Sequence, residues 1–139
     1  DDFYRPLAAE KGATLGPEES YQRYLDWERL LRDVLVPLDR PSRARYRRYD
    51  WATNGLAEWH EIEPRRVVIV EGVYSTRPEL RPYFSVMVYV DAPREVRLAR
   101  LLDRRYPDIS WVDHWMAAED WYVEHVRPTG QAAQVVGGW

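Results

Sequence analysis

Glu71 is the residue of this chain whose type and position most clearly suggest chemistry. It follows four consecutive β-branched residues, Val67–Val70, and precedes Gly72. An unbroken apolar run of this kind predicts a strand buried on both faces, as in a parallel sheet covered by helices. Ligands of open α/β sheets bind at the carboxyl ends of strands, and Gly72 would let the backbone turn sharply there. Phosphate-handling enzymes hold magnesium at such a carboxylate, although a strand that simply ends at a polar turn has the same sequence.

Two further apolar segments predict strands that would position Glu71. Residues 86–90 form a second buried run, which ends at Asp91, and residues 134–136 form a short third one. We expect 66–71, 86–90 and 134–136 to be neighbouring parallel strands with helices on both faces. The sequence thus predicts an α/β fold, a three-layer αβα P-loop NTPase-type domain with a mainly parallel sheet.

Proline, glycine and capping residues predict the helices between these strands. Pro17 begins a helix that Pro37 is expected to end, and Pro93 begins another. A capping-box spacing at Ser110 predicts a third helix, which runs to about Val126. The remaining segments are expected as a loop over 5–16, an extended or hairpin-like stretch over 39–55, a short helix or turn over 56–62, and a short helical or turn segment over 78–83.

The composition limits the class of protein. The chain has 139 residues, of which 45% are hydrophobic, which is enough for one domain and argues against disorder. It has no cysteine and no apolar run long enough to span a membrane, so we expect a cytoplasmic protein without disulfides. The net charge of −3 argues against bulk attraction to nucleic acid.

A cluster of arginines over Arg40–Arg48, with Tyr46 within it and Tyr49 directly after it, leaves a second interpretation open. Basic residues with aromatics can bind single-stranded nucleic acid or phosphorylated partners. A solvated loop that partly covers a substrate site has the same composition. The alternative to an enzyme is therefore a non-catalytic binding or interaction domain, and an unpaired sheet edge would favour a homo-oligomer.

Four blocks of sequence, in order, resemble the uridine kinase family of P-loop kinases, which is related to phosphoribulokinase. They are Asp1–Arg5, Tyr49–Trp51, Val67–Gly72, and Val90–Asp91 followed by Arg97 and Arg100. The resemblance implies a kinase that transfers the γ-phosphate of ATP, bound with Mg²⁺, to a hydroxyl of a nucleoside or similar small molecule.

The resemblance also implies roles for residues of the first half of the chain. Asp1 corresponds to the general base that takes the proton of the sugar hydroxyl. Tyr4 would line the nucleoside pocket, Tyr49 would contact the base, and Asp50 could contact the sugar. The pyrimidine kinases of the family have a histidine five residues after that tyrosine, where this chain has Asn54. This departure puts selectivity for pyrimidines in doubt.

In the second half, the resemblance assigns Glu71 as the Walker-B-like magnesium ligand. Arg97 and Arg100 correspond to arginines of the lid helix over the triphosphate. Their spacing of three places both on one helical face, where they would neutralise charge on the transferred phosphoryl group. A solvated basic helix is the alternative. We expect Asp1 and Glu71 to lie at the same edge of the sheet.

The chain has no G-x-x-x-x-G-K-[ST] phosphate-binding motif, and its single lysine is Lys11. It also begins without methionine, so we expect a part of a longer protein. We interpret 1–139 as one partial kinase domain without its N-terminal strand and P-loop, inactive by itself. Its expected parts are a substrate segment over about 1–65, a Walker-B-like strand over 66–72, a lid helix region over about 93–106, and a C-terminal helix and strand over 110–137.

Overall fold

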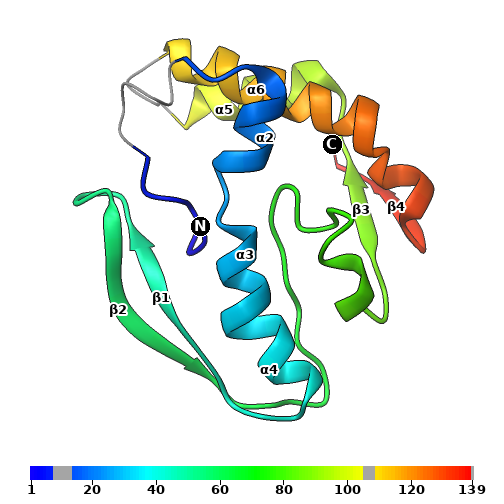
Figure 1. Cartoon of the computed structure of the whole chain (residues 1–139). Coiled ribbons are helices and arrows are strands. Elements are labelled where there is room, and N and C mark those ends of the chain that lie inside the picture. Colours follow the sequence, from blue (N-terminus) through cyan, green and yellow to red (C-terminus); the bar gives the residue numbers. More distant parts are fainter. Residues whose placement is uncertain (8–13, 105–108, 139) are drawn as a thin grey trace. The chain divides into compact units, whose positions relative to one another are not determined.

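The computed structural model describes residues 1–7, 14–104 and 109–138. The chain forms two compact units, each built from two separate segments (Figure 1). Unit 1 comprises Asp1–Ala8 and Arg23–Tyr83, and unit 2 comprises Ala9–Gln22 and Phe84–Trp139. The chain therefore passes between the units three times.

The sheet of unit 1 is a hairpin of two antiparallel strands. Strand β1 (Ala44–Asp50) pairs with β2 (Gly55–Ile62), from Ala44 opposite Ile62 to Asp50 opposite Gly55. The hairpin-like stretch expected over 39–55 is confirmed, whereas the short helix or turn expected over 56–62 is wrong. The ladder of hydrogen bonds to β1 satisfies the backbone of this segment, and a reading of local composition cannot detect such a distant partner.

One continuous helical rod packs beside the hairpin in unit 1 (Figure 1). It consists of α3 (Trp27–Leu30), a π-helical turn over Leu31–Leu35, and α4 (Val36–Asp39). Asp26 caps its start by accepting a hydrogen bond of 3.2 Å from the Arg29 amide. Pro37 does not end the helix as expected, because it lies in the first turn of α4, directly after the π-helical turn, where a missing N–H is tolerated.

The segment expected to be a buried parallel strand, residues 66–71, forms no strand. It is extended but pairs with no strand in the part of the chain that the structure describes. Val67 is 73% exposed and Ile69 is 85% exposed. A doubly buried strand needs neighbouring strands on both edges and helices on both faces, whereas the strands β1 and β2 in the described part of unit 1 pair with each other and not with this segment. Turns follow from Gly72 onward, and a 3₁₀ turn over Arg81–Tyr83 confirms the segment expected there.

Unit 2 contains the parallel pairing that the sequence predicts. Strand β3 (Val88–Asp91) pairs in parallel with β4 (Gln134–Gly137), with Val88 opposite Gln134 and Val90 opposite Val136. These two strands confirm the parallel arrangement of the second and third apolar segments. The α/β fold class is thus observed, with one parallel and one antiparallel pair.

The described part of unit 2 also contains helices α2, α5 and α6 (Figure 1). Helix α2 spans Pro17–Arg23, although Arg23 itself belongs to unit 1. Helix α5 (Arg94–Asp103) begins directly after Pro93, as expected. Helix α6 (Ile109–Val126) ends before Pro128, also as expected.

Each unit has its own apolar core. The buried side chains of unit 1 come from the helical rod, the hairpin and the turns after Gly72: Tyr24, Leu30, Val34, Leu35, Ala44, Tyr49, Tyr74 and Leu80. Those of unit 2 come mainly from α6: Leu15, Tyr21, Leu101, Val112, Trp115, Met116, Ala118 and Tyr122. Among the described residues, no helix combines the length and the apolar character needed to cross a membrane.

Candidate active site

The Asp1–Arg5 segment lies between the hairpin and the residues that precede α3, and backbone hydrogen bonds fix it on both sides. The amide of Tyr49 donates to the carbonyl of Asp2 over 2.9 Å. On the other side, Asp26 N donates to Phe3 O over 2.7 Å and Arg5 N to Tyr24 O over 2.9 Å. The first block of the family resemblance is therefore held in a defined conformation.

The two carboxylates at the start of this segment differ in their surroundings. The Tyr46 hydroxyl donates to Asp2 Oδ2 over 2.7 Å, in a partly buried position. Burial, together with this hydrogen bond, raises the pKa of Tyr46 to about 12. Asp1 is exposed, and its carboxylate has no hydrogen bond or ion pair with the described residues. Of the two, Asp1 is thus the carboxylate available to accept a proton from another molecule.

Three aromatic rings gather around the same segment. The ring of Tyr4 lies 4.5 Å from that of Trp51 and 5.8 Å from that of Tyr49, centroid to centroid. Tyr49 and Trp51 meet edge to face at 5.0 Å. Tyr49 is buried, while Trp51 is 52% exposed. Flat apolar faces of this kind stack on planar rings such as nucleobases.

Both the oxygen and the nitrogen of the Asn54 side-chain amide form hydrogen bonds that hold the hairpin turn in place. Its Oδ1 accepts from the Tyr49 hydroxyl over 2.9 Å, and its Nδ2 donates to the Leu7 carbonyl over 2.7 Å. The backbone of Asn54 has a φ of 48°, in the left-handed region that asparagine tolerates better than most residues. Asn54 therefore positions Tyr49 and ties the turn to the N-terminal segment.

Asp50 stabilises the same turn. Its Oδ1 accepts from the Ala52 amide over 3.2 Å and its Oδ2 from the Thr53 hydroxyl over 2.7 Å. These hydrogen bonds, that of Thr53 first, lower the pKa of Asp50. The carboxylate is therefore ionised at neutral pH and engaged locally.

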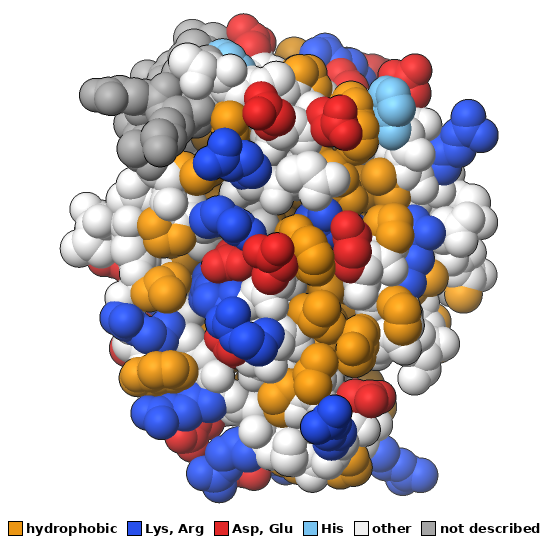
Figure 2. All heavy atoms as spheres, viewed as in Figure 1, with side chains coloured by type: hydrophobic (Ala, Val, Ile, Leu, Met, Phe, Trp, Pro, Cys, Tyr) orange, Lys and Arg blue, Asp and Glu red, His pale blue; other side chains and the backbone are white. Residues whose placement is uncertain are grey.

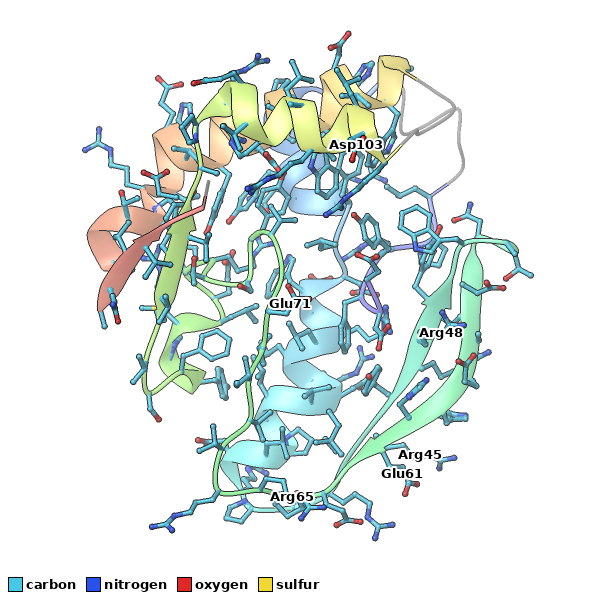
Figure 3. The ribbon with its side chains drawn as sticks, turned by 180° about the vertical axis from the view of Figure 1, so that it is seen from behind. Arg45, Arg48, Glu61, Arg65, Glu71 and Asp103 are labelled. Atoms are coloured by element: carbon cyan, nitrogen blue, oxygen red, sulfur yellow. The ribbon has the colours of Figure 1, made fainter. Side chains whose placement is uncertain are left out.

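Glu71 is exposed at the end of the extended segment, and Figure 3 shows it apart from the ion pairs of the hairpin. Gly72 follows with a φ of 146°, a conformation that favours glycine. The described residues contain no group of three or more histidine or acidic side chains that would form a complete metal site. A single exposed carboxylate fits Mg²⁺ bound with nucleotide phosphates and water, since this ion keeps several waters and takes only one or two protein ligands.

Arg97 and Arg100 lie on α5 of unit 2 and have different surroundings. Arg97 donates from Nε to the Ala92 carbonyl over 3.3 Å, from Nη1 to Glu119, and from Nη2 to Asp120 over 3.0 Å. Its guanidinium therefore connects α5 to α6. Arg100 is exposed and has no such ion pair with the described residues, so it is the freer of the two for binding an anion.

Three arginines of the hairpin region, Arg43, Arg45 and Arg48, are paired with acids across the two strands. Arg43 and Arg45 contact Glu61 over 3.1 and 3.7 Å, and Arg48 contacts Glu58 over 2.7 Å. Figure 3 shows Arg45 and Glu61 together at one end of the hairpin and Arg48 further along it. The hydrogen bond to Arg48 lowers the pKa of Glu58 to about 2. Basic and acidic side chains alternate over the hairpin, on the left of Figure 2, so its arginines do not form a field of one sign.

The structure therefore brings some of the predicted residues of unit 1 together. Tyr4, on the segment that carries Asp1, forms one connected cluster with Tyr49 and Asn54 of the hairpin. Neither Asp1 nor Glu71 lies at the end of a strand among the described residues, so the sheet edge that the two were expected to share is not observed. Sequence reasoning missed Arg29 and Tyr46, which hold the Asp1–Arg5 segment. Neither has a local signal, because their partners lie 27 and 44 positions away.

Comparisons with known proteins identify the family. The model of the phosphoribulokinase / uridine kinase family matches residues 18–136. Uridine kinases from two strains of Chloroflexus aurantiacus are 31% identical to the chain over 96 residues, which is 63% of this chain and 46% of each relative. The chain thus spans about half the length of these curated relatives.

A solved structure shows the same fold. The structure of a possible uridine kinase from Bacillus stearothermophilus superposes with a TM-score of 0.71 and 21% sequence identity, over 98% of this chain and 67% of that one. The chain therefore has the same α/β fold as that structure. Because the family model matches residues 18–136, the chain belongs to the phosphoribulokinase / uridine kinase family.

Proposed function

We propose that the complete protein containing this chain is an ATP-dependent kinase that phosphorylates a hydroxyl of a nucleoside or a similar small molecule. The observation that carries this proposal is the exposed carboxylate of Asp1, on a segment held by backbone hydrogen bonds beside the Tyr4, Tyr49 and Trp51 rings. A planar ring stacked on these aromatics would bring an attached hydroxyl toward Asp1.

Each residue has a defined task in this proposal. Asp1 accepts the proton of the attacking hydroxyl, which makes the oxygen a better nucleophile. Glu71 holds the magnesium ion, and Arg100 binds the phosphates. Magnesium-bound ATP supplies the phosphoryl group and the charge neutralisation that this transfer requires. Arg97 acts through the ion pairs that join α5 to α6, which keep the helix of Arg100 in place.

The 139 residues alone lack part of the site that an ATP-dependent kinase needs to bind the triphosphate. It contains no glycine-rich loop whose amides would surround the phosphates, and no lysine in such a motif. We therefore propose that the 139 residues form one part of a kinase domain and have no activity by themselves. The paired arginines of the hairpin argue against the alternative of a nucleic-acid-binding domain, because Arg43, Arg45 and Arg48 already form ion pairs with three acids, Glu58, Glu61 and Glu63.

The test is an assay of the complete protein with magnesium, ATP and a panel of nucleosides and other hydroxylated molecules, with the phosphorylated product identified by mass. Asp1→Asn should lower kcat by about 100- to 10,000-fold, the usual contribution of a general base. Asp39→Asn, at an exposed position at the end of α4, is the matched control and should keep the activity. A complete protein that phosphorylates nothing in the panel, or an Asp1→Asn variant with full activity, would contradict the proposal.

A further inference from the structure

Arg29 is a buried cation that binds mainly backbone carbonyl groups. It is the third residue of α3 and only 4% exposed. Its Nη2 donates to the carbonyls of Asp2 over 2.9 Å and Tyr4 over 3.3 Å. Its Nη1 donates to the carbonyl of Arg47 on β1. One side chain therefore joins the N-terminal segment, the hairpin and the helical rod.

The ring of Phe3 completes the environment of this guanidinium. The Arg29 Cζ atom lies 4.8 Å from the centre of the Phe3 ring, within the range of a cation–π interaction. Three consecutive residues of the segment, Asp2, Phe3 and Tyr4, thus contact one arginine.

Asp26 balances the charge of Arg29 and connects it to the other side of the segment. Its Oδ2 accepts from Arg29 Nε over 3.2 Å, and its Oδ1 accepts from the Arg29 amide. The same Oδ1 lies 3.4 Å from Nη2 of Arg5, which also pairs with Glu28 over 2.8 Å. A buried charge is tolerated when it is paired and its donors are satisfied, and every nitrogen of the Arg29 guanidinium has an acceptor here.

The side chain outside this network is that of Asp1. The Asp2 carboxylate is held by Tyr46, Phe3 lies on Arg29, and the Tyr4 ring packs on Trp51. The fixed backbone at Asp2 leaves the exposed Asp1 carboxylate with few rotatable bonds between it and a rigid support. Fixing a catalytic group in this way is worth a large part of a rate enhancement, because a misplacement of 1 Å can cost on the order of 100-fold.

We propose that Arg29 is a positioning residue for the Asp1 carboxylate, acting through the carbonyls of Asp2 and Tyr4. This inference rests on the function proposed above. A planar guanidinium can donate in several fixed directions at once, whereas a lysine ammonium is a compact point charge. Arg29 is therefore specific to its position, and lysine does not replace it.

The test compares Arg29→Lys and Arg29→Gln with Arg32→Gln in the complete protein. Arg32 is the matched control, because it lies three positions further along the same helical rod, is 69% exposed, and pairs only locally with Asp33 over 2.7 Å. Both Arg29 variants should lose on the order of 10- to 100-fold in kcat per folded enzyme, with the KM for ATP changed less than threefold. Arg32→Gln should keep both parameters.

A second measurement does not depend on activity. In the 139-residue chain, hydrogen exchange at the amides of Arg5, Asp26 and Tyr49 reports the bonds that hold the segment. Arg29→Gln should speed exchange at these three amides at least tenfold relative to Arg32→Gln, while the amides of α6 keep their protection. The fraction of folded protein, measured by circular dichroism, corrects for any general loss of stability.

The outcomes separate the two proposals. Unchanged kcat in both Arg29 variants, or an equal loss in Arg32→Gln, would overturn the positioning role and leave the kinase function intact. Full activity of Arg29→Lys alone would show that charge rather than the guanidinium fork is required, which also contradicts the inference. If the wild-type protein transfers no phosphate, the proposed function fails, and unchanged exchange at the three amides would then refute the anchoring of the segment independently.

Discussion

Tyr46 and Asp2 are joined by a hydrogen bond of 2.7 Å between residues 44 positions apart. The Tyr46 ring also lies 4.9 Å from that of Phe3 and 5.5 Å from that of His60. This contact makes the two adjacent carboxylates of the N-terminal segment different, since Asp2 is held by a phenol while Asp1 remains exposed. A sequence with two aspartates in a row thus has one structural and one available carboxylate.

The raised pKa of Tyr46 predicts a dependence of stability on alkaline pH. Burial and the bond to Asp2 raise this pKa from 10 to about 12 in the folded chain. Folding therefore favours the neutral phenol, and the stabilisation is complete below pH 10 and lost as the pH rises from 10 toward 12. Urea unfolding at increasing pH should show a falling free energy of unfolding in this window. The fall should be smaller in Tyr46→Phe, and equal slopes in both proteins would contradict the assignment.

Substitutions of the two arginines of α5 should have different effects: one should lower the stability of the fold, and the other should weaken the binding of ATP. Arg97→Gln removes the cation that pairs with Glu119, whose side chain is only 14% exposed, and with Asp120. We expect the free energy of unfolding to drop by about 1–3 kcal/mol, the cost of leaving partly buried polar groups without a partner. Arg100→Gln, at an exposed position, should stay within about 0.5 kcal/mol of wild type but raise the KM for ATP in the complete protein. Similar unfolding midpoints for the two variants would contradict this prediction.

The exposure of the extended segment can be tested by substitution. Ile69 is 85% exposed, so Ile69→Thr should change the free energy of unfolding of the 139-residue chain by less than about 0.5 kcal/mol. Leu80 is 1% exposed, and Leu80→Ala should cost about 2–5 kcal/mol. Denaturant unfolding of both variants gives the comparison. A loss at Ile69 as large as that at Leu80 would mean that the segment is buried.

Substrate choice should depend on the turn that Asn54 closes. Since the Leu7 carbonyl can only accept, the amide of Asn54 has one orientation, and both of its ends are already engaged. Pyrimidine kinases that the chain resembles have histidine at this place. A mismatched polar contact costs roughly 1–3 kcal/mol, or about 5- to 150-fold in discrimination. We therefore expect uridine and cytidine to be poor substrates of the complete protein.

The assay for this prediction compares kcat/KM over nucleosides, sugars and vitamin-like alcohols with magnesium and ATP. Asn54→His is the matched variant and should shift the ranking toward the pyrimidine nucleosides. Uridine or cytidine as the best wild-type substrate by a wide margin would contradict the inference drawn from Asn54.

The fold was predictable where local signals decide it. Pro93 and Pro128 bound their helices, and the apolar segments around Val88 and Val135 pair in parallel as expected. The prediction failed for residues 66–71. Their apolar pattern indicates a buried strand, but such a pattern does not show whether another strand lies alongside to form the backbone hydrogen bonds. The prediction failed for 56–62 for the opposite reason, because β1 supplies a partner that local composition does not reveal.

For the candidate site, the sequence predicts the types of side chain that it contains but not the contacts that they make. The sequence indicates which carboxylates and arginines resemble those of a kinase, but not which of them are already occupied. Arg97 is bound by acids 22 and 23 positions away. Arg29 belongs to no sequence motif, and its side chain donates to backbone carbonyl groups, which any residue could provide. Contacts of this kind depend on the tertiary fold rather than on residue spacing.

The interleaved segments of the two units have a consequence for the order of events during translation. The ring of Tyr21 packs 5.2 Å from that of Trp121 and 5.4 Å from that of Tyr122, both on α6. These contacts of unit 2 form only after the ribosome has added about a hundred further residues, and unit 1 can complete its core in the meantime. Long sequence separation between contacting residues slows folding. During translation the early helix of unit 2 therefore has no α6 to pack against until the C-terminal part of the chain has been made.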